Sequence, residues 1–552
     1  MRLVLYKPLV RPEYLLDPFW SIYPGFSSLK AYLNVHEPEC DVRTACTVAG
    51  IAAAQPDIVG ISSVSEMWPR ACDAVRQLRR DGFDGPILIG GPHITALPET
   101  LPAQADCGVV GQGEQPLLEL VRAYKRTCQP DLSAIPGLAY WQGTGQLART
   151  APPVLPELDT LPVDVSEYPA TCFNILTIRG CPYHCRHCVE HDTQGKLRYL
   201  SAERLLEIMK QRVVVTGNPE FFFQDDTFLA APRRLERLHA LMAQQNLLGA
   251  FRIRMVSLNA NLVREHTVRL LKEIGVQALG MGAESLNPRV LEAFKRNVVK
   301  LGDIERTIRY AEQEGLPLGG RQVYGYPGET RDEMLDSIQR SRDFERFRGY
   351  RTWPSFVCQP LPGSLLWQDE LDRGRVQPEM DFSTLRIDGD CRHFASEWFY
   401  GNEAQVPRAE FLRILGDHRL IDKHFFVSDA ERNRLQPPQP QRGLRRTRWV
   451  VNSLLDVLEG KRSWRETSIG RRLTGRSEQA AHAGSNNNQP AVGATTPAAS
   501  SGRCPHAVPS ADAPRGPRPD DATKPPAPAM HTRASGANET SGVKSPSGAK
   551  YR

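Results

Sequence analysis

The sequence predicts an α/β protein with a doubly wound parallel sheet, followed by a partial (β/α) barrel, a helical C-terminal region and a disordered tail. Short apolar runs alternate with helical patterns over residues 1–145 and again over 171–390. Strands that alternate with helices favour a parallel sheet covered by helices. A chain of 552 residues is too long for one hydrophobic core, so we expect more than one domain.

The first domain, residues 1–145, is expected to alternate strands with helices. The predicted strands are Leu3–Tyr6, Asp41–Thr47, Ile58–Val64, Ile87–Gly90 and Gly108–Gly111, and the predicted helices lie near 26–34, 67–81, 96–104 and 115–125. Ligands of such sheets bind outside the carboxyl ends of the strands, and glycines there let a ligand approach the backbone closely. The residues that make these strand ends ligand-site candidates are Ser62, Ser63, Gly90, Gly91, Gly111, Gly113 and Glu114.

A linker and a second alternating region follow. Residues 146–170 are rich in proline and acidic residues, which indicates a linker between domains. In residues 171–390 we expect strands at Ile175–Ile178, Glu220–Gln224, Arg252–Ser257, Ala278–Gly282, Gly319–Tyr324 and Arg351–Gln359, with helices at 202–214, 231–245 and 262–274. Repeated units of this length are typical of a full or partial (β/α) barrel.

The C-terminal part changes composition. Residues 391–476 are expected to be mostly helical, with an excess of arginine and lysine over 441–476 that we interpret as a solvated helix face and not as a nucleic-acid site. From 477 to 552 Ala, Pro, Gly, Ser and Asn dominate, and Tyr551 is the one aromatic residue. Such a segment buries too little apolar surface to offset its ordering entropy, so we expect a disordered tail.

Composition narrows the class of protein. No apolar stretch reaches the ~18 residues that a membrane-spanning helix needs, and the first ten residues resemble a β-strand more than a signal peptide. We therefore expect a cytoplasmic protein with no membrane partner. The 12 cysteines are scattered apart from one tight group, so reduced thiols are expected and not a disulfide framework.

The tight group is the segment Gly180-Cys181-Pro182-Tyr183-His184-Cys185-Arg186-His187-Cys188, which follows a predicted strand. Three thiolates at this spacing can hold a [4Fe–4S] cluster and leave the fourth iron without a protein ligand. A zinc site is the alternative, with His184, His187 or His191 as fourth ligand. Structural zinc prefers a second Cys-x-x-Cys pair, and none follows in the sequence, so the spacing favours the cluster.

The motif resembles that of the radical S-adenosylmethionine (SAM) superfamily, and the resemblance extends over roughly 171–370. It implies that Cys181, Cys185 and Cys188 hold the cluster, and that SAM chelates the open iron and is cleaved reductively to a 5′-deoxyadenosyl radical. It also implies a set of SAM-binding residues, namely His187, Gln224, Asp225, Asp226 and Glu284. Structural alternatives remain open: the aspartates as helix caps, Glu284 as the start of a helix over 285–295, and residues 325–330 as a tight turn.

The first domain resembles Rossmann-like cobalamin-binding domains, through segments 56–63, 89–93 and 110–114. The two resemblances together indicate a cobalamin-binding-domain-containing radical SAM enzyme similar to the class B radical SAM methyltransferases, with a TIM-like barrel. The motif Asp-x-His-x-x-Gly, whose histidine ligates cobalt from below in other corrinoid domains, is missing. We expect His93 to have a satisfied polar role and not to be a ligand, and a vestigial domain that binds nothing is the alternative.

The resemblance implies methyl transfer to an unactivated carbon or phosphorus of a small-molecule substrate of the secondary-metabolite type. An external electron donor such as flavodoxin or ferredoxin is implied as well. The alternatives are a cobalamin-associated radical cyclase, rearrangement or oxygenation enzyme, and a non-catalytic metal-cluster sensor or scaffold. The sequence identifies no catalytic residue beyond the cofactor sites. Several aromatic residues are expected in the core more than in a substrate cavity: Trp353, Phe356, Trp367, Phe394, Trp398, Phe399 and Tyr400.

Overall fold

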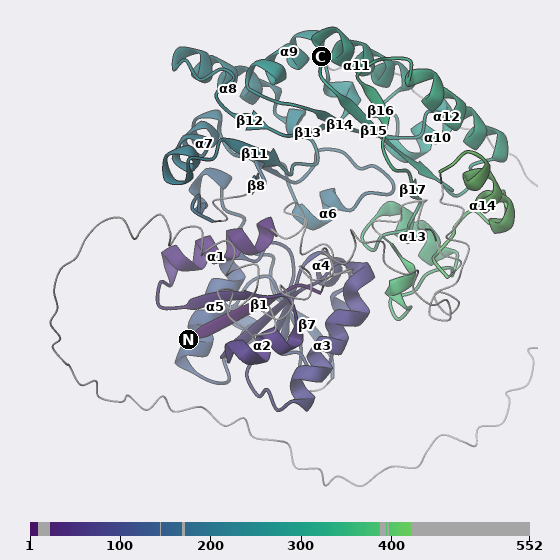
Figure 1. Cartoon of the computed structure of the whole chain (residues 1–552). Helices are drawn as coiled ribbons and strands as arrows, with labels where there is room; N and C mark the ends of the chain where they lie inside the picture. Colours follow the sequence, from purple (N-terminus) through teal and green to yellow (C-terminus); the bar gives the residue numbers. More distant parts are fainter. Residues whose placement is uncertain (9–22, 144, 168–171, 387–393, 395–396, 421–552) are drawn as a thin grey trace, which may run out of the picture. The chain divides into compact units, whose positions relative to one another are not determined.

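The computed structural model describes residues 1–8, 23–143, 145–167, 172–386, 394 and 397–420 (Figure 1). The predicted tail over 477–552 and the basic segment over 441–476 lie outside the described residues. Within the described part, no helix is both long enough and apolar enough to cross a membrane.

The N-terminal domain is built on a seven-stranded sheet of order β2-β1-β3-β4-β5-β6-β7. The parallel strands are β1 (Arg2–Tyr6), β2 (Asp41–Ala45), β3 (Ile58–Ser62), β4 (Ile87–Gly90) and β5 (Cys107–Val109), and the antiparallel edge consists of β6 (Leu138–Trp141) and β7 (Leu147–Arg149). The helices are α1 (Pro24–His36), α2 (Val48–Ala54), α3 (Trp68–Arg80), α4 (Pro92–Ala96) and α5 (Glu114–Arg126).

Alternating side chains of β1 explain why helices cover both faces of this sheet. Leu3 and Leu5 pack in one core with residues of α1 and α5. Val4 and Tyr6 pack in another core with residues of α2 and α3. A strand buried on both sides is apolar throughout, which is why the sequence pattern detects it, and the predicted doubly wound sheet is confirmed.

The predictions for this domain need three corrections. The helix expected over 96–104 is absent: α4 ends at Ala96 and a single turn covers Pro98–Thr100, because a proline disfavours helix both at its own position and just before it. Helix α2 was not predicted, and Ile51 is its one buried residue, so it carries no clear periodicity. The sheet continues to Arg149 through β7, so the connection to the second domain begins after 149 and not at 146.

The second domain contains the parallel strands of a partial barrel. One sheet has the order β12-β11-β8, and the other runs β13-β14-β15-β16 with β17 paired to β15. These strands are β8 (Phe173–Ile175), β11 (Glu220–Phe223), β12 (Arg252–Ile253), β13 (Val256–Leu258), β14 (Leu279–Glu284), β15 (Leu318–Tyr324), β16 (Tyr350–Thr352) and β17 (Phe356–Val357). The α/β barrel type predicted from the sequence is confirmed, although three of the predicted strands are each broken into two short pieces.

Helices lie along the outer side of these strands (Figure 1). They are α7 (Ala202–Thr216), α8 (Pro232–Gln244), α9 (Glu265–Glu273), α10 (Pro288–Lys295), α11 (Leu301–Glu314) and α12 (Arg331–Phe344). Strand β11 shows how the layers form: Phe221 and Phe223 pack in the main core, whereas Phe222 between them points to the other side and lines a cavity. This alternation follows from the two-residue period of a strand.

Short elements complete the domain: β9 (Ile178–Arg179) and β10 (Arg198–Tyr199), which pair antiparallel, α6 (Glu190–Gln194), α13 (Leu365–Asp372) and α14 (Arg408–Asp417). In the described part of the region expected to be mostly helical, α14 is the one α-helix, so that expectation is wrong for residues 397–407. Trp367, Phe394, Trp398 and Tyr400 are buried in apolar cores and Phe399 packs against one, as predicted.

Candidate active site

A cavity of about 880 Å³ is lined by residues at the carboxyl ends of the strands of both domains. Parallel sheets and barrels place their ligand sites at this edge. With one exception, every residue predicted as a site residue from the sequence lines it: Cys181, Cys185, Cys188, His187, Gln224, Asp225, Asp226, Glu284, Ser62, Gly90, Gly91, Gly111, Gly113 and Glu114. The structure therefore brings the two predicted sets of residues to one space.

The exception is Ser63, which does not line the cavity. Its side chain is buried and donates a hydrogen bond to the carbonyl oxygen of Val64 at 2.9 Å. Its backbone amide donates to the carbonyl oxygen of Gly90, and its own carbonyl oxygen accepts from the amide of His93. Ser63 thus supports the local backbone, and Ser62 is the serine that faces the cavity.

The cysteine loop connects β9 to α6. It begins at Gly180, whose φ of +81° and whose hypothetical Cβ, 2.5 Å from the carbonyl oxygen of Gly195, leave room for glycine alone. Two backbone hydrogen bonds fix its centre: the Arg186 amide donates to the Phe294 carbonyl at 2.9 Å, and the Arg186 carbonyl accepts from the Leu366 amide at 2.8 Å. The loop is therefore held by α10 and by the start of α13.

All three thiols of the loop face the cavity. Cys185 is buried, and Cys181 and Cys188 are half-buried. Burial raises the pKa of each thiol, and the nearby Lys295 ammonium partly offsets this for Cys185. Thiolates in such a place need a cation or a metal for stability, so the three sulfurs fit an iron–sulfur cluster, whose irons supply that charge.

The histidines of the loop have other contacts. His191 Nδ1 lies 3.1 Å from the carbonyl oxygen of Cys181, and the rings of His184 and His191 have centroids 3.4 Å apart. His187 lines the cavity, with Nε2 3.7 Å from a Glu284 carboxylate oxygen. Its Nδ1 is buried and has no hydrogen-bond partner within the described structure. An unpartnered nitrogen on a ring that lines a cavity fits a bound group with its own polar atoms.

Glu284 ends β14 with a φ of 55°, a left-handed conformation that a non-glycine residue adopts at a cost. This conformation aims its carboxylate at Lys295, whose Nζ lies 2.7 Å from Oε1. Burial acts to raise the pKa of Glu284, but the Lys295 ammonium, together with His187 and Arg321, outweighs burial, and the pKa lies below its usual range. Glu284 does not open a helix, because α10 begins at Pro288 behind the capping side chain of Asn287.

Lys295 was missed by the sequence analysis. Its side chain is 5% exposed and lines the same cavity as the cysteines. Burial acts to lower its pKa, yet Glu284 and the neighbouring thiol of Cys185 raise it above the usual range, so the ammonium is charged. The sequence feature that could have indicated a buried Lys295 is its place on the apolar face of a helix, one residue after Phe294 and four after Leu291.

The two aspartates after β11 have different surroundings. Asp225 is buried and accepts hydrogen bonds from the amides of Thr177 at 2.6 Å and Ile178 at 3.0 Å, and from the Thr177 hydroxyl. It therefore ties β11 to the segment that leads into the cysteine loop, and it caps no helix. Burial raises its pKa to about 6, against the pull of Arg234.

Asp226 lies next to Glu190, a second residue that the sequence analysis missed, and both line the cavity. The two carboxyl groups share a hydrogen bond, and burial together with the charge of Asp226 raises the pKa of Glu190 to about 8. One proton shared between them lets both side chains stay buried. Glu190 lies two residues after Cys188, and this closeness to the thiol loop is the sequence feature that could have identified it as a site residue.

The N-terminal wall of the cavity combines glycines with a buried ion pair. Gly91 has a φ of +99°, and a Cβ there would lie 2.8 Å from Ser62 Oγ. Glu114 is 5% exposed and pairs with Arg179 at 2.7 Å, while Arg179 also donates to Gln112 Oε1 at 2.9 Å. Arg179 directly precedes the cysteine loop, so Glu114 links the wall of the first domain to that loop.

Lys7 and Tyr23 also line this wall and were not predicted. The Lys7 ammonium lies 3.9 Å from the centre of the Tyr23 ring, a cation–π contact. Burial lowers the pKa of Lys7 to about 8. The wall therefore offers glycine backbone, a ring and a cation, which fits a large ligand with polar edges.

Two alternatives from the sequence analysis prove correct. His93 is fully buried, with Nδ1 3.0 Å from Ser65 Oγ and Nε2 3.1 Å from Thr100 Oγ1, so its polar atoms are satisfied inside the protein as predicted. Residues 325–330 form a turn in which the buried Glu329 accepts a hydrogen bond from the Gly325 amide at 2.7 Å. None of these residues lines the cavity.

Two aromatic residues expected in the core line the cavity instead, which corrects the prediction for Trp353 and Phe356. The Trp353 indole lies across the glycines of two strands: a Cβ at Gly280 would be 3.1 Å from it, and one at Gly319 would be 1.7 Å away. The Arg321 guanidinium carbon lies 5.5 Å from the Trp353 ring and 5.1 Å from the Phe356 ring. These side chains form an aromatic wall with one cation.

Comparison with known families assigns both domains. The model of the Radical SAM superfamily matches residues 175–340, and the model of the B12 binding domain matches residues 25–121. The chain is a radical SAM enzyme with a B12-binding domain. The two family matches imply a [4Fe–4S] cluster, SAM and cobalamin as its cofactors, as predicted.

The relatives of this radical SAM enzyme include cobalamin-dependent radical SAM methyltransferases. The chain is 28% identical over 363 residues to an uncharacterized methyltransferase of Pyrococcus horikoshii, covering 62% of this chain and 76% of that one. It is 27% identical over 308 residues to the cobalamin-dependent radical SAM methyltransferase TokK of Streptomyces tokunonensis, covering 51% and 44%. The structure of TsrM from Kitasatospora setae with cobalamin and a [4Fe–4S] cluster has the same fold, with a TM-score of 0.60 at 18% identity over 87% of this chain and 99% of that one.

Proposed function

We propose that the enzyme transfers a methyl group to an unactivated carbon or phosphorus of a small molecule. The observation that carries the proposal is the shared cavity, which the strand ends of both domains line together. A radical source and a methyl carrier act on one substrate atom only if both face the same space. Radical cyclisation, rearrangement and oxygenation are the alternatives. They use the same cofactors, and analysis of the reaction products distinguishes them from methyl transfer.

In this proposal the cluster is held by the thiolates of Cys181, Cys185 and Cys188, and SAM lies beside it. When bound, cluster and SAM supply a one-electron cleavage of the sulfonium bond. His187, Gln224, Asp225, Asp226 and Glu284 would surround SAM, because all five line the cavity that the three thiols face.

The chain's own residues would prepare this site through charge. The Lys295–Glu284 pair places a cation near the sulfurs of Cys185 and Cys188, which offsets the negative charge of thiolates in a buried place. Asp226 and Glu190 line the same cavity, and their carboxyl oxygens would accept hydrogen bonds from the amino group of SAM.

Cobalamin would lie against the N-terminal wall, formed by Ser62, Gly90, Gly91, Gly111, Gly113 and Glu114. When bound, it supplies the methyl group. Lys7 and Tyr23 add a cation and a ring to this wall. Because His93 is enclosed by Ser65 and Thr100, the chain would hold the corrinoid through its edges and not through a histidine under the cobalt.

The substrate would lie against the aromatic wall of Trp353, Phe356 and Arg321, on the barrel side of the cavity. Relatives act on chemically different molecules, among them a tryptophan 2-C-methyltransferase of Streptomyces laurentii at 23% identity and a cytidylyl-2-hydroxyethylphosphonate methyltransferase of Streptomyces wedmorensis at 24%. We infer a small-molecule substrate with an apolar or planar part. An oxygen-sensitive cluster with reduced thiols further suits the cytoplasm, where an electron donor such as flavodoxin or ferredoxin is at hand.

Anaerobic reconstitution with iron, sulfide and hydroxocobalamin tests the cofactor sites. The expected result is about four irons and about one cobalt per chain, with 5′-deoxyadenosine released from SAM. Cys185→Ala should lose iron and 5′-deoxyadenosine, whereas the matched control Cys358→Ala, which removes a buried thiol outside the cavity, should keep both. Equal iron in the two variants would refute the ligand assignment.

Product analysis tests the reaction. A methyltransferase of this kind should form S-adenosylhomocysteine alongside 5′-deoxyadenosine, because one SAM recharges the methyl carrier and a second starts the radical step. Release of 5′-deoxyadenosine with no S-adenosylhomocysteine, in the presence of bound cobalamin, would favour the cyclase, rearrangement or oxygenation alternative over methyl transfer.

A further inference from the structure

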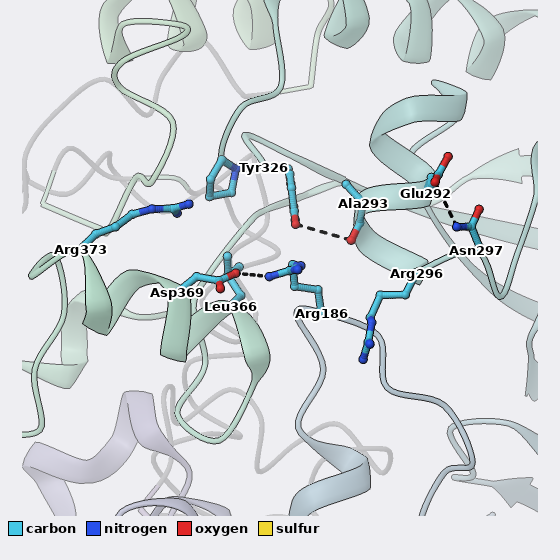
Figure 2. Close-up of a pocket in the computed structure, with 10 residues that line it drawn as sticks. Arg186, Glu292, Ala293, Arg296, Asn297, Tyr326, Leu366, Asp369 and Arg373 are labelled. Carbon is cyan, nitrogen blue, oxygen red and sulfur yellow. Dashed lines mark hydrogen bonds and ion pairs between the residues drawn. The ribbon is translucent and has the colours of Figure 1, made fainter. Parts of the chain in front are cut away.

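A second pocket, of about 420 Å³, lies against the cysteine loop but shares no lining residue with the active-site cavity. Its lining includes Arg186, Arg296, Arg373 and Tyr326 (Figure 2). Residues adjacent in the sequence line opposite spaces: Cys185 and His187 line the cavity, whereas Arg186 between them lines the pocket. Likewise, Lys295 lines the cavity and Arg296 lines the pocket. The pocket is therefore the reverse side of the wall that carries the thiols.

The arginines give this pocket a positive surplus. Arg186 forms an ion pair with Asp369, and Glu292 accepts a hydrogen bond from Asn297 at 3.0 Å (Figure 2). Arg373 shares a single buried carboxylate, Glu370, with Arg375, at 2.7 and 2.5 Å.

Arg296 carries the positive charge of the pocket that is most accessible to a partner. It is exposed, and within the described part of the chain no carboxylate is recorded in an ion pair with it. Its backbone has a φ of 51° at the end of α10, so the chain turns there and Lys295 and Arg296 point to opposite sides. The pocket thus presents a cation to solvent only one residue from the lysine beside the thiols.

Packed rings lead from this pocket to His187, the neighbour of Cys188 in the thiol loop. The Tyr326 ring, which lines the pocket, has its centroid 4.5 Å from that of Phe294, and Phe294 lies 5.1 Å from His187 in the cavity. The Phe294 carbonyl also accepts the hydrogen bond from the Arg186 amide. Electron transfer through protein weakens steeply with distance and with gaps, so a short, well-packed connection between solvent and cluster favours it.

We propose that this arginine pocket, formed by Arg186, Arg296 and Arg373, is the docking site of an acidic one-electron carrier protein with a flavin or iron–sulfur centre. The proposal rests on the proposed function in that each cleavage of SAM consumes one electron. In the step, the reduced carrier loses one electron and the cluster gains it, and no bond or proton moves. Charge complementarity would steer an acidic carrier to the cationic pocket.

Charge reversal in the reconstituted holoenzyme tests this docking site. The variants are Arg296→Glu and Arg296→Glu/Arg373→Glu, and the control is Arg306→Glu, an arginine of α11 that is 51% exposed. Each is mixed with reduced flavodoxin, and cluster reduction is followed by the loss of its visible absorption, with affinity measured by calorimetry. A small reductant, dithionite, serves as the parallel arm.

We expect the double variant to slow flavodoxin-driven reduction by about tenfold or more at low salt and to weaken its binding to a similar degree. Reduction of the double variant by dithionite should be unchanged. The control variant should match the wild type with both reductants. Unaltered flavodoxin kinetics in the double variant, or an equal loss with dithionite, would overturn the docking site. Because SAM cleavage with dithionite reports the chemistry separately, the proposed function would survive that result.

Discussion

The buried Lys295–Glu284 pair allows a quantitative prediction for Lys295→Met in the cofactor-free protein. Methionine keeps much of the volume and removes the charge. The side chains are 5% and 11% exposed and the two charged atoms lie 2.7 Å apart, so the change leaves Glu284 buried without its cation. Breaking a buried pair in this way costs about 3–5 kcal/mol, and we expect a loss near the lower end because the cavity admits water.

The loss should depend on pH with a defined sign. In the wild type Lys295 holds the pKa of Glu284 below its usual range, so the pair contributes stability that is present above the unfolded-state pKa of about 4.3 and fades below it. In the variant, burial raises the pKa of Glu284, and protonation relieves the unpaired charge as the pH falls. The difference between the two proteins should therefore be largest near pH 7.5 and smaller at pH 5.

Urea unfolding followed by circular dichroism at both pH values measures this difference. The double change Lys295→Met/Glu284→Gln should recover most of the loss, because it removes both charges together. Lys210→Met is the control, since Lys210 is exposed and its ammonium contacts only the Gln245 side chain in the described structure, and it should stay within about 0.5 kcal/mol. A single variant as stable as the control, or a double variant no better than the single, would refute the reasoning.

Three further predictions concern residues outside the thiol cluster. His93→Gln should make the free energy of unfolding less dependent on pH in acid. Burial lowers the pKa of His93 to about 3, so the wild type loses about 1.4 kcal/mol of stability per pH unit below about pH 6.5, where the unfolded chain takes up the proton. If urea unfolding gave wild type and variant the same pH dependence, the prediction would be contradicted. Gly319→Ala should shift the Trp353 indole, which a Cβ would meet at 1.7 Å, at a cost of about 1–3 kcal/mol; tryptophan fluorescence reports the shift, and an unchanged spectrum would count against it. Arg179→Gln should lower the free energy of unfolding by about 3 kcal/mol, because it leaves Glu114 buried and unpaired, and it should weaken hydroxocobalamin binding measured by absorption titration. Arg179→Lys keeps the charge and should cause a smaller loss of both. Equal losses in the two variants would show that the charge of Arg179 does not cause them.

The sequence predicted those parts of the structure that are encoded locally. The spacing of Cys181, Cys185 and Cys188 specifies a ligand loop by itself, and the strands of the first sheet are visible because both of their faces are buried. The site residues at strand ends followed from the rule that parallel sheets bind ligands at their carboxyl edge, and all of them except Ser63 reach the cavity. The prediction for Ser63 is wrong because this residue lies just after β3, where its side chain and backbone hydrogen-bond to neighbouring backbone groups and do not face the cavity.

The residues that were missed depend on contacts between distant segments. Lys295 matters because the left-handed backbone at Glu284 directs a carboxylate toward it, and no local pattern announces that conformation. Trp353 reaches the cavity because glycines at 280 and 319, on two neighbouring strands, leave a flat surface for its ring. Its aromatic character alone favoured the core, and only the register between strands reveals the space.

The ion pair between Arg179 and Glu114 makes the two halves of the enzyme a matched set and not exchangeable modules. Arg179 stands one residue before the glycine that opens the thiol loop, and its partner belongs to the first helix after the fifth strand of the other domain. A chimera that took residues 1–149 from a family member with an uncharged side chain at the equivalent of 114 would enclose a guanidinium with no anion. Recombination between relatives would therefore succeed only when both positions travel together.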